Sequence, residues 1–333
     1  MERLQLLNPG RLKEMWIIKA IIAVAVILAI GFCTIVAVAM KECVVRPKDT
    51  TVDYDSLSEK HKIRYKLRQR NNQYLYDKNP EDLSLTDKQG NELKAWFVPA
   101  EGSKRFVIAV HGYKCNGPDE CSHLFPFYNE TLGFNYLLPD HVSHGRSEGK
   151  YISFGATESE NLLLWVDYLI DRFGEDIEIV LHGISMGAAT VMLANASNPP
   201  DQVKCVIEDC GYTSAFDIIA FNMKKMTGIE MPHIAKGVIL ACRLFLGFNM
   251  NEADCLGRMK DMKNPILFIH GTADPTVPFE MAERLYEACT VPKDKMFKEG
   301  LIHAYCYYDA KQEYEEKMVE FFSKHLTDFN VDN

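Results

Sequence analysis

The chain has 333 residues, of which 47% are hydrophobic and 25% are charged, and its formal net charge is −9. These fractions are those of an ordinary globular protein, and the length alone permits one large domain or two small ones. The acidic balance shows no basic surface of the kind that nucleic acids require, so we expect no nucleic-acid partner.

The first informative segment is an uncharged, apolar run from Ala20 to Met40. About 20 apolar residues suffice for a helix to cross a bilayer. Lys19 and Trp16 stand at the entry of the run, where snorkelling side chains and interfacial aromatic rings are common. We therefore expect residues 1–15 to form an N-terminal tail and residues 16–40 to form a transmembrane signal anchor.

A secretory signal peptide is the rival interpretation of this segment. The apolar core of such a peptide usually has about 7–15 residues, fewer than here, but Ala37-Val38-Ala39 is an acceptable cleavage site. Basic residues on the two sides of the segment are nearly balanced. They are Arg3, Arg11 and Lys13 before it, and Lys41, Arg46 and Lys48 after it. Because the tail is short and the following domain is large, we expect a single-pass membrane protein with its domain outside the cytoplasm.

Residues 41–80 are polar and charged, and we expect a membrane-proximal connector that is partly helical. Its basic residues lie close together, at Lys60, Lys62, Arg64, Lys66, Arg68 and Arg70. Such a stretch near a membrane can contact anionic headgroups, and it can equally form an ordinary solvated helix face.

From residue 81 onward, short apolar runs alternate with segments of helical length. The predicted strands are Leu93–Val98, Phe106–Val110, Phe134–Leu138, Ile177–Leu181, Val203–Ile207, Pro265–Ile269 and Lys295–Lys298. The predicted helices include Glu158–Phe173, Gly187–Asn195 and Glu280–Cys289. This alternation predicts an α/β domain over residues 81–330, with a mostly parallel sheet covered by helices on both faces. Ligands of such sheets bind beyond the carboxyl ends of the strands.

Residues 212–263 interrupt the alternation, because helical signals continue there without a clear strand. We expect a helical cap inserted over the site, with its main helix opening at Pro232-His233. Apolar residues recur in it at near-helical spacing, at Ile234, Val238, Ala241, Leu244, Phe245 and Phe248. We expect most of this stripe to pack on the body of the domain; an apolar substrate pocket or a membrane contact is the alternative.

The sequence Gly183-Ile184-Ser185-Met186-Gly187 follows one predicted strand and precedes a helix of small residues. In that context G-x-S-x-G forms a sharp strand-to-helix turn with an exposed, strained serine. The two glycines remove Cβ atoms that would clash, and the helix N-terminus stabilises developing negative charge. Ser185 is therefore the predicted nucleophile.

A serine hydroxyl needs a base within hydrogen-bonding reach, and the base needs an orienting acid. After a serine on such a turn, the acid and then the histidine follow in the chain. Asp274 lies in the loop after the strand Pro265–Ile269, and His303 follows the strand Lys295–Lys298. We predict Asp274 as the acid and His303 as the base.

Other residues offer alternatives for these roles. Asp209 ends an earlier strand and is a second possible acid. His325 falls in a C-terminal helix, where we expect it at the surface. His182 and His270 end strands beside glycines, and we expect both to be buried and hydrogen-bonded rather than catalytic.

An oxyanion hole requires two backbone N–H donors aimed at the developing charge. We predict that one belongs to Met186, directly after the nucleophile. The other is predicted at Tyr113, in the loop after the strand Phe106–Val110, and the ring of Tyr113 is placed to shape the acyl pocket.

Several stretches together resemble the α/β-hydrolase superfamily, in the branch of membrane-anchored bacterial hydrolases and eukaryotic relatives of the Bem46-like type. They are His111-Gly112-Tyr113, Pro139–Ser147, Gly183–Gly187, Asp209–Tyr212, His270–Pro278 and His303, and they extend over roughly residues 90 to 325. The resemblance implies the same triad and the same oxyanion hole. The sequence departs from the commonest pattern at His141, where many relatives carry Arg, which is expected to alter the loop beside the site.

The chemistry predicted from these residues is hydrolysis of a carboxylic ester through an acyl-enzyme, as in esterases and lipases. The apolar anchor and cap make a small-molecule or lipid-like ester the expected substrate. A serine peptidase or amidase of the same fold is the alternative, with Glu158, Glu160 and Asp209 left open as ligands for a peptide N-terminus. A non-catalytic, membrane-anchored scaffold is a further alternative. No cofactor or metal is expected.

Ten cysteines occur in the chain, one of them, Cys33, in the predicted span. No C-x-x-C pair is present, so the cysteines predict neither a zinc site nor a redox motif. Cys115 and Cys121 are close enough in one predicted loop to pair, and most of the others are expected to be buried free thiols.

Overall fold

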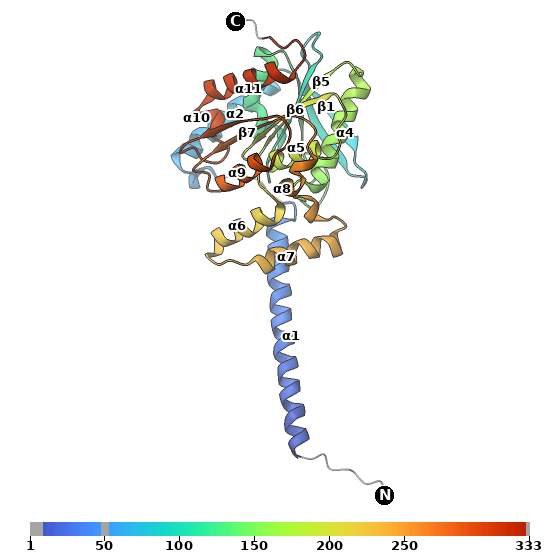
Figure 1. Cartoon of the computed structure of the whole chain (residues 1–333), viewed down its shortest axis with the longest axis vertical. Coiled ribbons are helices and arrows are strands. Elements are labelled where there is room, and N and C mark those ends of the chain that lie inside the picture. The colour runs from blue at the N-terminus through green and yellow to red at the C-terminus, as the bar shows by residue number, and fades with distance from the viewer. Residues whose placement is uncertain (1–8, 48–52, 331–333) are drawn as a thin grey trace.

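The computed structural model describes residues 9–47 and 53–330. Helix α1 (Pro9–Cys43) leaves the α/β body as a long stalk, and the last helix, α11 (Lys311–His325), lies on the far side of the body (Figure 1). The stretch from Lys13 to Cys43 is long and apolar enough to cross a membrane. Because almost all of its side chains are exposed, α1 is not a core helix of the body.

The predicted tail differs from the structure, because residues 9–15 already belong to α1. The predicted span, residues 16–40, lies wholly inside the helix. The rest of the predicted tail, residues 1–8, lies outside the described residues, and so do Arg3 and Lys48 of the charge comparison.

In the described residues, eight strands form one sheet in the order β1-β2-β4-β3-β5-β6-β7-β8. The pairs β1–β2 and β2–β4 are antiparallel, and the other pairs are parallel. The strands are β1 Glu81–Thr86, β2 Glu92–Val98, β3 Arg105–Val110, β4 Asn135–Pro139, β5 Glu178–Ile184, β6 Val203–Asp209, β7 Ile266–Gly271 and β8 Lys293–Lys298.

Helices connect the strands and also precede and follow the sheet. The α-helices after α1 are α2 Glu59–Tyr76, α3 Gly117–Cys121, α4 Ala156–Phe173, α5 Met186–Asn195, α6 Ala215–Thr227, α7 Pro232–Ala241, α8 Cys255–Arg258, α9 Phe279–Ala288, α10 Cys306–Asp309 and α11 Lys311–His325. Short 3₁₀ segments are η1 Tyr54–Ser56, η2 Ser122–Leu124, η5 Met250–Glu252 and η6 Met259–Asp261, and π-helical segments are η3 Pro126–Thr131 and η4 Cys242–Leu246.

Alternate side chains of the strands pack into two apolar clusters, one on each face of the sheet. In β3, Phe106 and Ile108 join one cluster, whereas Val107 and Ala109 join the other. Helices α4, α5 and α9 contribute to the first cluster, and α2, α3 and α11 contribute to the second. The predicted α/β architecture, a mostly parallel sheet covered on both faces, is confirmed.

Strand β1 was not predicted from the sequence. Only Leu83 of its six residues is buried, because β1 is the edge strand and pairs with β2 alone. An edge strand with one buried side chain has no apolar run that a pattern search can detect.

The basic connector packs on the body of the protein. For Arg64 and Arg68, its two most buried arginines, neither contact with lipid headgroups nor a solvated helix face, the two interpretations from the sequence, holds. Arg64 lies 2.8 Å and Arg68 3.8 Å from the carboxylate of Glu120. Burial would raise the pKa of Glu120, but the two guanidinium groups outweigh burial and lower that pKa to about 2. Helix α2 is therefore fixed to α3 by a partly buried ion pair, and these two arginines do not face lipid or open solvent.

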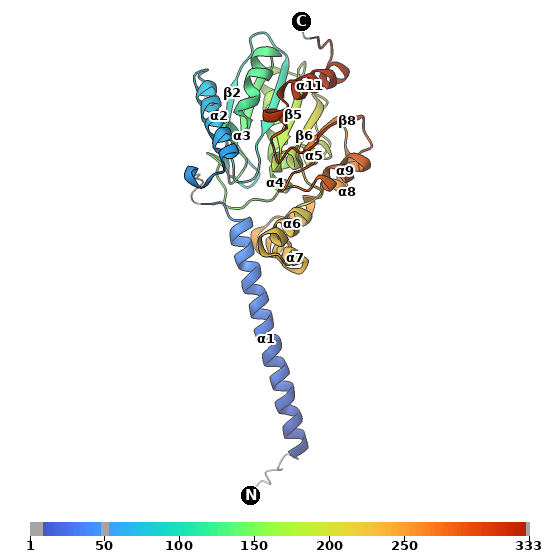
Figure 2. The same ribbon diagram turned by 90° about the vertical axis from the view of Figure 1, so that its left-hand side faces the viewer.

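Between β6 and β7 the chain forms helical segments and no strand of the sheet. Helices α6 and α7 lie beside the end of α1 that enters the body (Figures 1 and 2). The predicted apolar stripe divides here, because Val238 is fully buried whereas Leu244 and Phe245 are 63% and 78% exposed. Most of the stripe packs as expected, since Ile234, Val238, Ala241 and Phe248 join the apolar cluster, and Leu244 and Phe245 are the exceptions.

Candidate active site

Ser185 occupies the sharp turn between β5 and α5. Its φ of 58° and ψ of −116° form a strained combination that residues other than glycine rarely adopt. A Cβ at Gly183 would collide with the backbone of Gly187, and a Cβ at Gly187 would collide with the carbonyl of Val110. The N–H of Ser185 donates to the carbonyl oxygen of Asp209 at 2.8 Å. The tight turn thus requires both glycines and is fixed against β6.

Asp274 and His303 come from two loops and meet Ser185 at the same edge of the sheet. Asp274 follows β7, and His303 lies between β8 and α10. His303 Nε2 lies 2.9 Å from Ser185 Oγ, and His303 Nδ1 lies 2.6 Å from Asp274 Oδ2. Because an ionised carboxylate only accepts hydrogen bonds, Nδ1 carries the proton and Nε2 accepts from the serine hydroxyl. The three predicted residues form one hydrogen-bonded chain.

Both carboxylate oxygens of Asp274 are held by donors. Oδ1 accepts from the backbone N–H groups of Thr276 at 2.7 Å and Val277 at 2.9 Å. Oδ2 lies 3.4 Å from His270 Nε2 in addition to its bond with His303. Burial alone would raise the pKa of Asp274, but hydrogen bonds from the two histidines and from Val277 outweigh it and lower that pKa. The carboxylate is therefore ionised at neutral pH. Sequence reasoning missed this contact of His270.

The other polar residues considered as alternatives are engaged elsewhere. Asp209 Oδ2 accepts from the hydroxyl of Tyr314 at 2.9 Å, and burial raises the pKa of Asp209 to about 6. His182 is buried between the hydroxyls of Tyr128 and Tyr314, at 2.9 Å and 3.1 Å. His325 ends α11 and is half-buried. None of these residues replaces Asp274 or His303 in the hydrogen-bonded chain.

The loop after β3 passes directly against Ser185. A Cβ added at Gly112 would lie 3.2 Å from the Cβ of Ser185, so the loop approaches this closely because no side chain intervenes. Met186 is the first residue of α5, where N–H groups have no acceptor within the helix. In the described part of the chain, the N–H groups of Met186 and Tyr113 have no backbone acceptor. The two N–H groups that the sequence predicts for an oxyanion hole are therefore free of backbone partners, and their role stays a prediction.

The same loop is bonded to the end of α1. The hydroxyl of Tyr113 donates to the carbonyl oxygen of Cys43 at 2.9 Å, and Lys114 Nζ donates to that of Glu42 at 2.7 Å. A cation at a helix C-terminus also interacts favourably with the helix dipole. The ring of Tyr113 stacks on Phe154, with centroids 5.3 Å apart. The apolar helix therefore ends on the loop that supplies one of the two N–H groups.

Residues 148–328, more than half of the chain, match the model of the prolyl oligopeptidase family (Peptidase S9). The chain belongs to the prolyl oligopeptidase family. The uncharacterized protein YqkD of Bacillus subtilis is 28% identical over 232 residues, which are 70% of this chain and 75% of YqkD. The uncharacterized membrane protein YNL320W of Saccharomyces cerevisiae is 23% identical over 226 residues, 66% of this chain and 71% of that protein.

The fold of this prolyl oligopeptidase family member is also that of solved α/β hydrolases. The esterase Pf2001 of Pyrococcus furiosus superposes with a TM-score of 0.62 at 21% identity, over 76% of this chain and 94% of that chain. The predicted α/β-hydrolase fold is thereby confirmed. The narrower Bem46-like assignment stays a prediction.

His141 supports the loop after β3 in this prolyl oligopeptidase family member. Its N–H donates to His111 Nε2 at 3.0 Å, and its Nε2 lies 3.0 Å from the carbonyl oxygen of His111. Burial lowers the pKa of both histidines, so both are neutral at pH 7. His141 therefore supports the loop beside Ser185 through hydrogen bonds rather than through charge.

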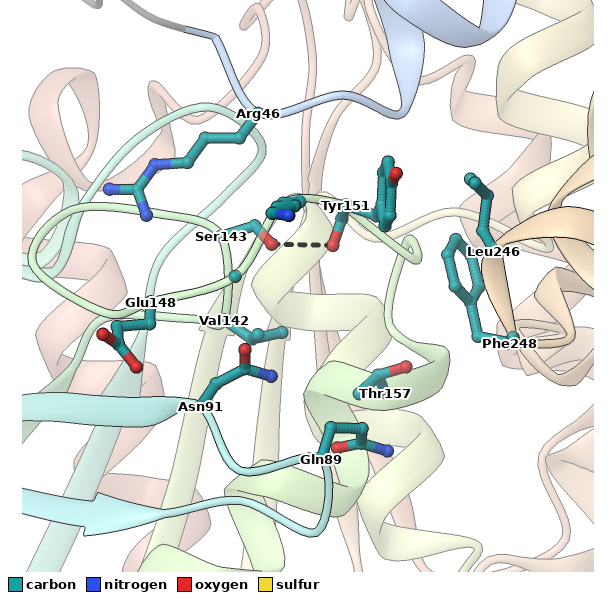
Figure 3. A pocket seen from close by; sticks show the side chains of 13 residues that line it. Arg46, Gln89, Asn91, Val142, Ser143, Glu148, Tyr151, Thr157, Leu246 and Phe248 are labelled. Carbon is teal, nitrogen blue, oxygen red and sulfur yellow. Dashed lines mark hydrogen bonds between the residues drawn. The ribbon is translucent and has the colours of Figure 1, made fainter.

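A cavity of about 630 Å³ opens elsewhere on the body (Figure 3). Its walls come from the β1–β2 turn, the loop around residues 142–151 and the segment that follows α7. The lining residues are Arg46, Gln89, Asn91, Val142, Ser143, Glu148, Gly149, Lys150, Tyr151, Thr157, Leu246, Gly247 and Phe248. Because Ser185, Asp274 and His303 do not line it, the cavity is separate from the hydrogen-bonded chain.

Cys210 is a neighbour of the triad that the sequence did not mark. Its Sγ lies 4.0 Å from His303 Nε2, and Cys210, Asp274 and His303 offer ligand atoms within 4.8 Å of one another. A metal needs the thiolate, whereas burial raises the pKa of Cys210 well above its ordinary value. These residues therefore suit the hydrogen-bonded chain better than a metal. All ten cysteines lie in the described residues as free thiols, so Cys115 and Cys121 do not pair.

Proposed function

We propose that this serine hydrolase cleaves carboxylic esters through an acyl-enzyme, with Ser185 as nucleophile, His303 as base and Asp274 as the orienting acid. The observation that carries the proposal is the unbroken chain from Asp274 Oδ2 through both His303 nitrogens to Ser185 Oγ, at 2.6 and 2.9 Å. These distances are within the reach that proton transfer from a serine requires.

Each residue has a defined task in the two half-reactions. Ser185 Oγ attacks the ester carbonyl while His303 Nε2 takes its proton, and Asp274 stabilises the imidazolium that forms. The N–H groups of Met186 and Tyr113 bind the tetrahedral oxyanion. Collapse of this intermediate expels the alcohol, which takes the proton from His303. Water then gives a proton to His303 and attacks the acyl carbon, and Ser185 is regenerated as the carboxylic acid leaves.

A peptidase or amidase is the second candidate, and the match to the prolyl oligopeptidase family favours it. The three acidic residues that sequence reasoning left open are all engaged. Glu158 is buried and accepts from backbone N–H groups before α4. Glu160 lies 3.3 Å from Lys88, and Asp209 bonds Tyr314. The ester hypothesis is preferred because Glu158 and Asp209 are buried and bonded within the protein, which leaves only the exposed Glu160 for a peptide N-terminus, and because the similar solved structure is named an esterase.

The proposal includes a single uncleaved membrane span, with the hydrolase body outside the cytoplasm. Val36 is buried although its neighbours on α1 are exposed, and Val44 is buried in the body. Cleavage after Ala39 would remove the buried contact of Val36. The presence of this contact therefore favours a helix that is retained. Protease protection of the body in sealed vesicles, with sequencing of the mature N-terminus, tests both the orientation and the retention.

The activity is tested by labelling the full chain with a fluorophosphonate probe. We expect labelling of the wild type and none of Ser185→Ala. Hydrolysis of p-nitrophenyl esters with short to long acyl chains, beside chromogenic prolyl peptides, then separates the two candidates. Peptide turnover exceeding ester turnover would replace the first candidate by the second. A folded wild type that takes no label would overturn both, and would favour a non-catalytic scaffold.

A further inference from the structure

Helix α7 packs directly on α1, well before the helix reaches the body. A Cβ added at Gly237 would lie 2.7 Å from Val36 Cγ2 and 3.2 Å from Phe32 Cζ, so the glycine allows the two helices to touch. In Figure 1 α7 runs crosswise to α1, and Figure 2 shows the same two helices side by side. The contact lies within the apolar span of α1, rather than at the end of the span.

The depth of the α1–α7 contact in a bilayer follows from the length of the apolar span. A hydrocarbon core of about 30 Å needs about 20 residues at about 1.5 Å each. The uncharged run after Lys19 reaches that length near Ala39. Phe32 and Val36 then lie about 10 and 5 Å below its upper boundary. If the lipid ended below Phe32, the uncharged run would span only about 18 Å, too short to cross.

Exposed side chains of α1 continue up to the level of α7. Ile35 and Val38 are 49% and 57% exposed, although they flank the buried Val36. Water would face these apolar side chains if the bilayer ended lower on the helix. Their exposure favours a bilayer that reaches the level of the contact with α7.

The segment around α7 presents apolar side chains at this same level. Outside α1, the four most exposed large apolar side chains in the described residues are Met226, Phe245, Leu244 and Ile229, at 82%, 78%, 63% and 62%. Leu240 on α7 is 56% exposed. Monomeric soluble proteins seldom gather apolar side chains in this way without a partner. The opposite side of α7, with Val238, is buried. One face of the helix therefore packs on the protein, and the other face is exposed.

Basic residues accompany the apolar ones, as is typical of helices that lie in a membrane interface. Lys236 and Arg243 are exposed on α7 and η4. Their long side chains can reach the headgroups while their stems lie against apolar surface. An in-plane helix of this kind buries its apolar face about 5–10 Å into the boundary between headgroups and acyl chains, which agrees with the depth derived from α1.

We propose that the exposed apolar side chains between Met226 and Phe245 insert into the same bilayer leaflet as the upper end of α1, with lipid acyl chains as their occupant, while the ion-paired Glu230 stays at the level of the headgroups. The helix α7 then lies in the plane of the interface, and Gly237 joins it to the membrane span. The loop beside Ser185 adjoins the end of α1, because Tyr113 bonds Cys43. The proposal concerns membrane contact and holds whether or not the protein cleaves esters.

The test places tryptophan probes in the full chain in phosphatidylcholine vesicles. The parent carries Trp16→Phe, which removes the native tryptophan of α1. Phe245→Trp reports on the cap segment, and Phe173→Trp, at the end of α4 furthest from α1, is the matched control. Vesicles contain lipid brominated in the upper or the lower part of the acyl chain, because bromine quenches tryptophan on contact.

We expect upper-chain bromine to lower the added emission of Phe245→Trp about twofold, as suits a depth of about 5–10 Å, and to leave Phe173→Trp unchanged. Leu244→Trp should behave as Phe245→Trp, which guards against a local folding defect at one position. Emission at both cap positions that is equal with and without bromine would overturn the proposal. If a cross-link between two chains at these positions accompanied that result, the face would belong to a second copy of this chain.

Discussion

The two sides of the active site are held together by different kinds of contact. The triad side consists of Ser185, Asp274 and His303, each of which follows a strand in the parallel part of one sheet. The anchor side consists of the end of α1, the loop at Tyr113 and helices α6 and α7, which come from distant parts of the chain. The proposed chemistry therefore depends on strand ends that a parallel sheet brings together, whereas access to it depends on packing against α1.

The largest expected effect tests the assignment of Asp274 as the acid on the triad side. We expect Asp274→Asn to lower kcat for a soluble ester by about 10⁴-fold, because the imidazole loses its orienting acceptor and favours the wrong tautomer. Asp209→Asn, the matched control, should cost less than about tenfold, because its carboxylate bonds Tyr314. Steady-state kinetics decide the matter, and equal losses in both variants would contradict the assignment.

On the anchor side the largest expected effect concerns substrate in a membrane. Leu244→Glu combined with Phe245→Glu removes two apolar side chains from the proposed interface. Hydrolysis of a long-chain ester embedded in vesicles should fall by at least about a hundredfold, because burial of each of the two side chains contributes about 1.5–3 kcal/mol to contact with lipid. Turnover of a water-soluble ester is the internal control and should not change. A parallel fall in both activities would point to a folding defect and remove the distinction between the two sides.

A smaller effect is expected where the two sides touch. Tyr113→Phe removes the hydroxyl bond to Cys43 and keeps the backbone N–H. We expect kcat to fall about fivefold with little change in KM, because a lost bond of about 1 kcal/mol loosens the loop that supports the oxyanion. Tyr168→Phe on α4 is the matched control. An unchanged kcat would mean that the end of α1 has no influence on the chemistry.

A last effect concerns stability rather than activity, and it is a change in acid sensitivity at the buried His144, in the loop after β4. Burial lowers the pKa of His144 from 6.5 to about 3. Below pH 6.5 the unfolded chain therefore binds a proton that the folded chain does not, and the free energy of unfolding decreases as pH falls towards 3. His144→Phe should remove this dependence. As the pH falls from 6.5 towards 3, the free energy of unfolding of the variant should therefore rise relative to that of the wild type by about 1.4 kcal/mol per pH unit. Chemical unfolding in detergent at several pH values measures the difference, and parallel curves would contradict it.

The triad side was largely predictable from the sequence, because its signals are local. A short apolar run followed by Gly183–Gly187 identifies a strand and its turn without knowledge of the rest of the fold. Asp274 and His303 also follow strands, and a parallel sheet brings such positions to one edge. The contact of His270 with Asp274 was not predictable, since His270 looks from the sequence like any other buried histidine.

The anchor side was much less predictable, because each of its contacts joins segments far apart in the chain. The apolar run of α1 indicates length and composition, but not that Gly237 packs on Val36 or that Tyr113 bonds Cys43. The basic connector shows the same limit, since the partner of Arg64 and Arg68 is Glu120, some 50 residues away. Periodicity does mark α7 as amphipathic, yet it cannot tell which partner covers each face.

The short segment after α1 has a consequence for how this enzyme would meet its substrate. Val44 is buried, Val45 forms an antiparallel bridge with Tyr151, and Arg46 donates to the carbonyls of Gly145 and Ser147, both at 2.6 Å. The span therefore joins the body as a rigid strut, not as a swinging tether. In a bilayer, the reactive serine is held at a constant height and facing, and its encounters with substrate become two-dimensional. The rate for a lipid-borne ester then follows the mole fraction of that ester in the membrane, so dilution with inert lipid slows the reaction while dilution with buffer does not.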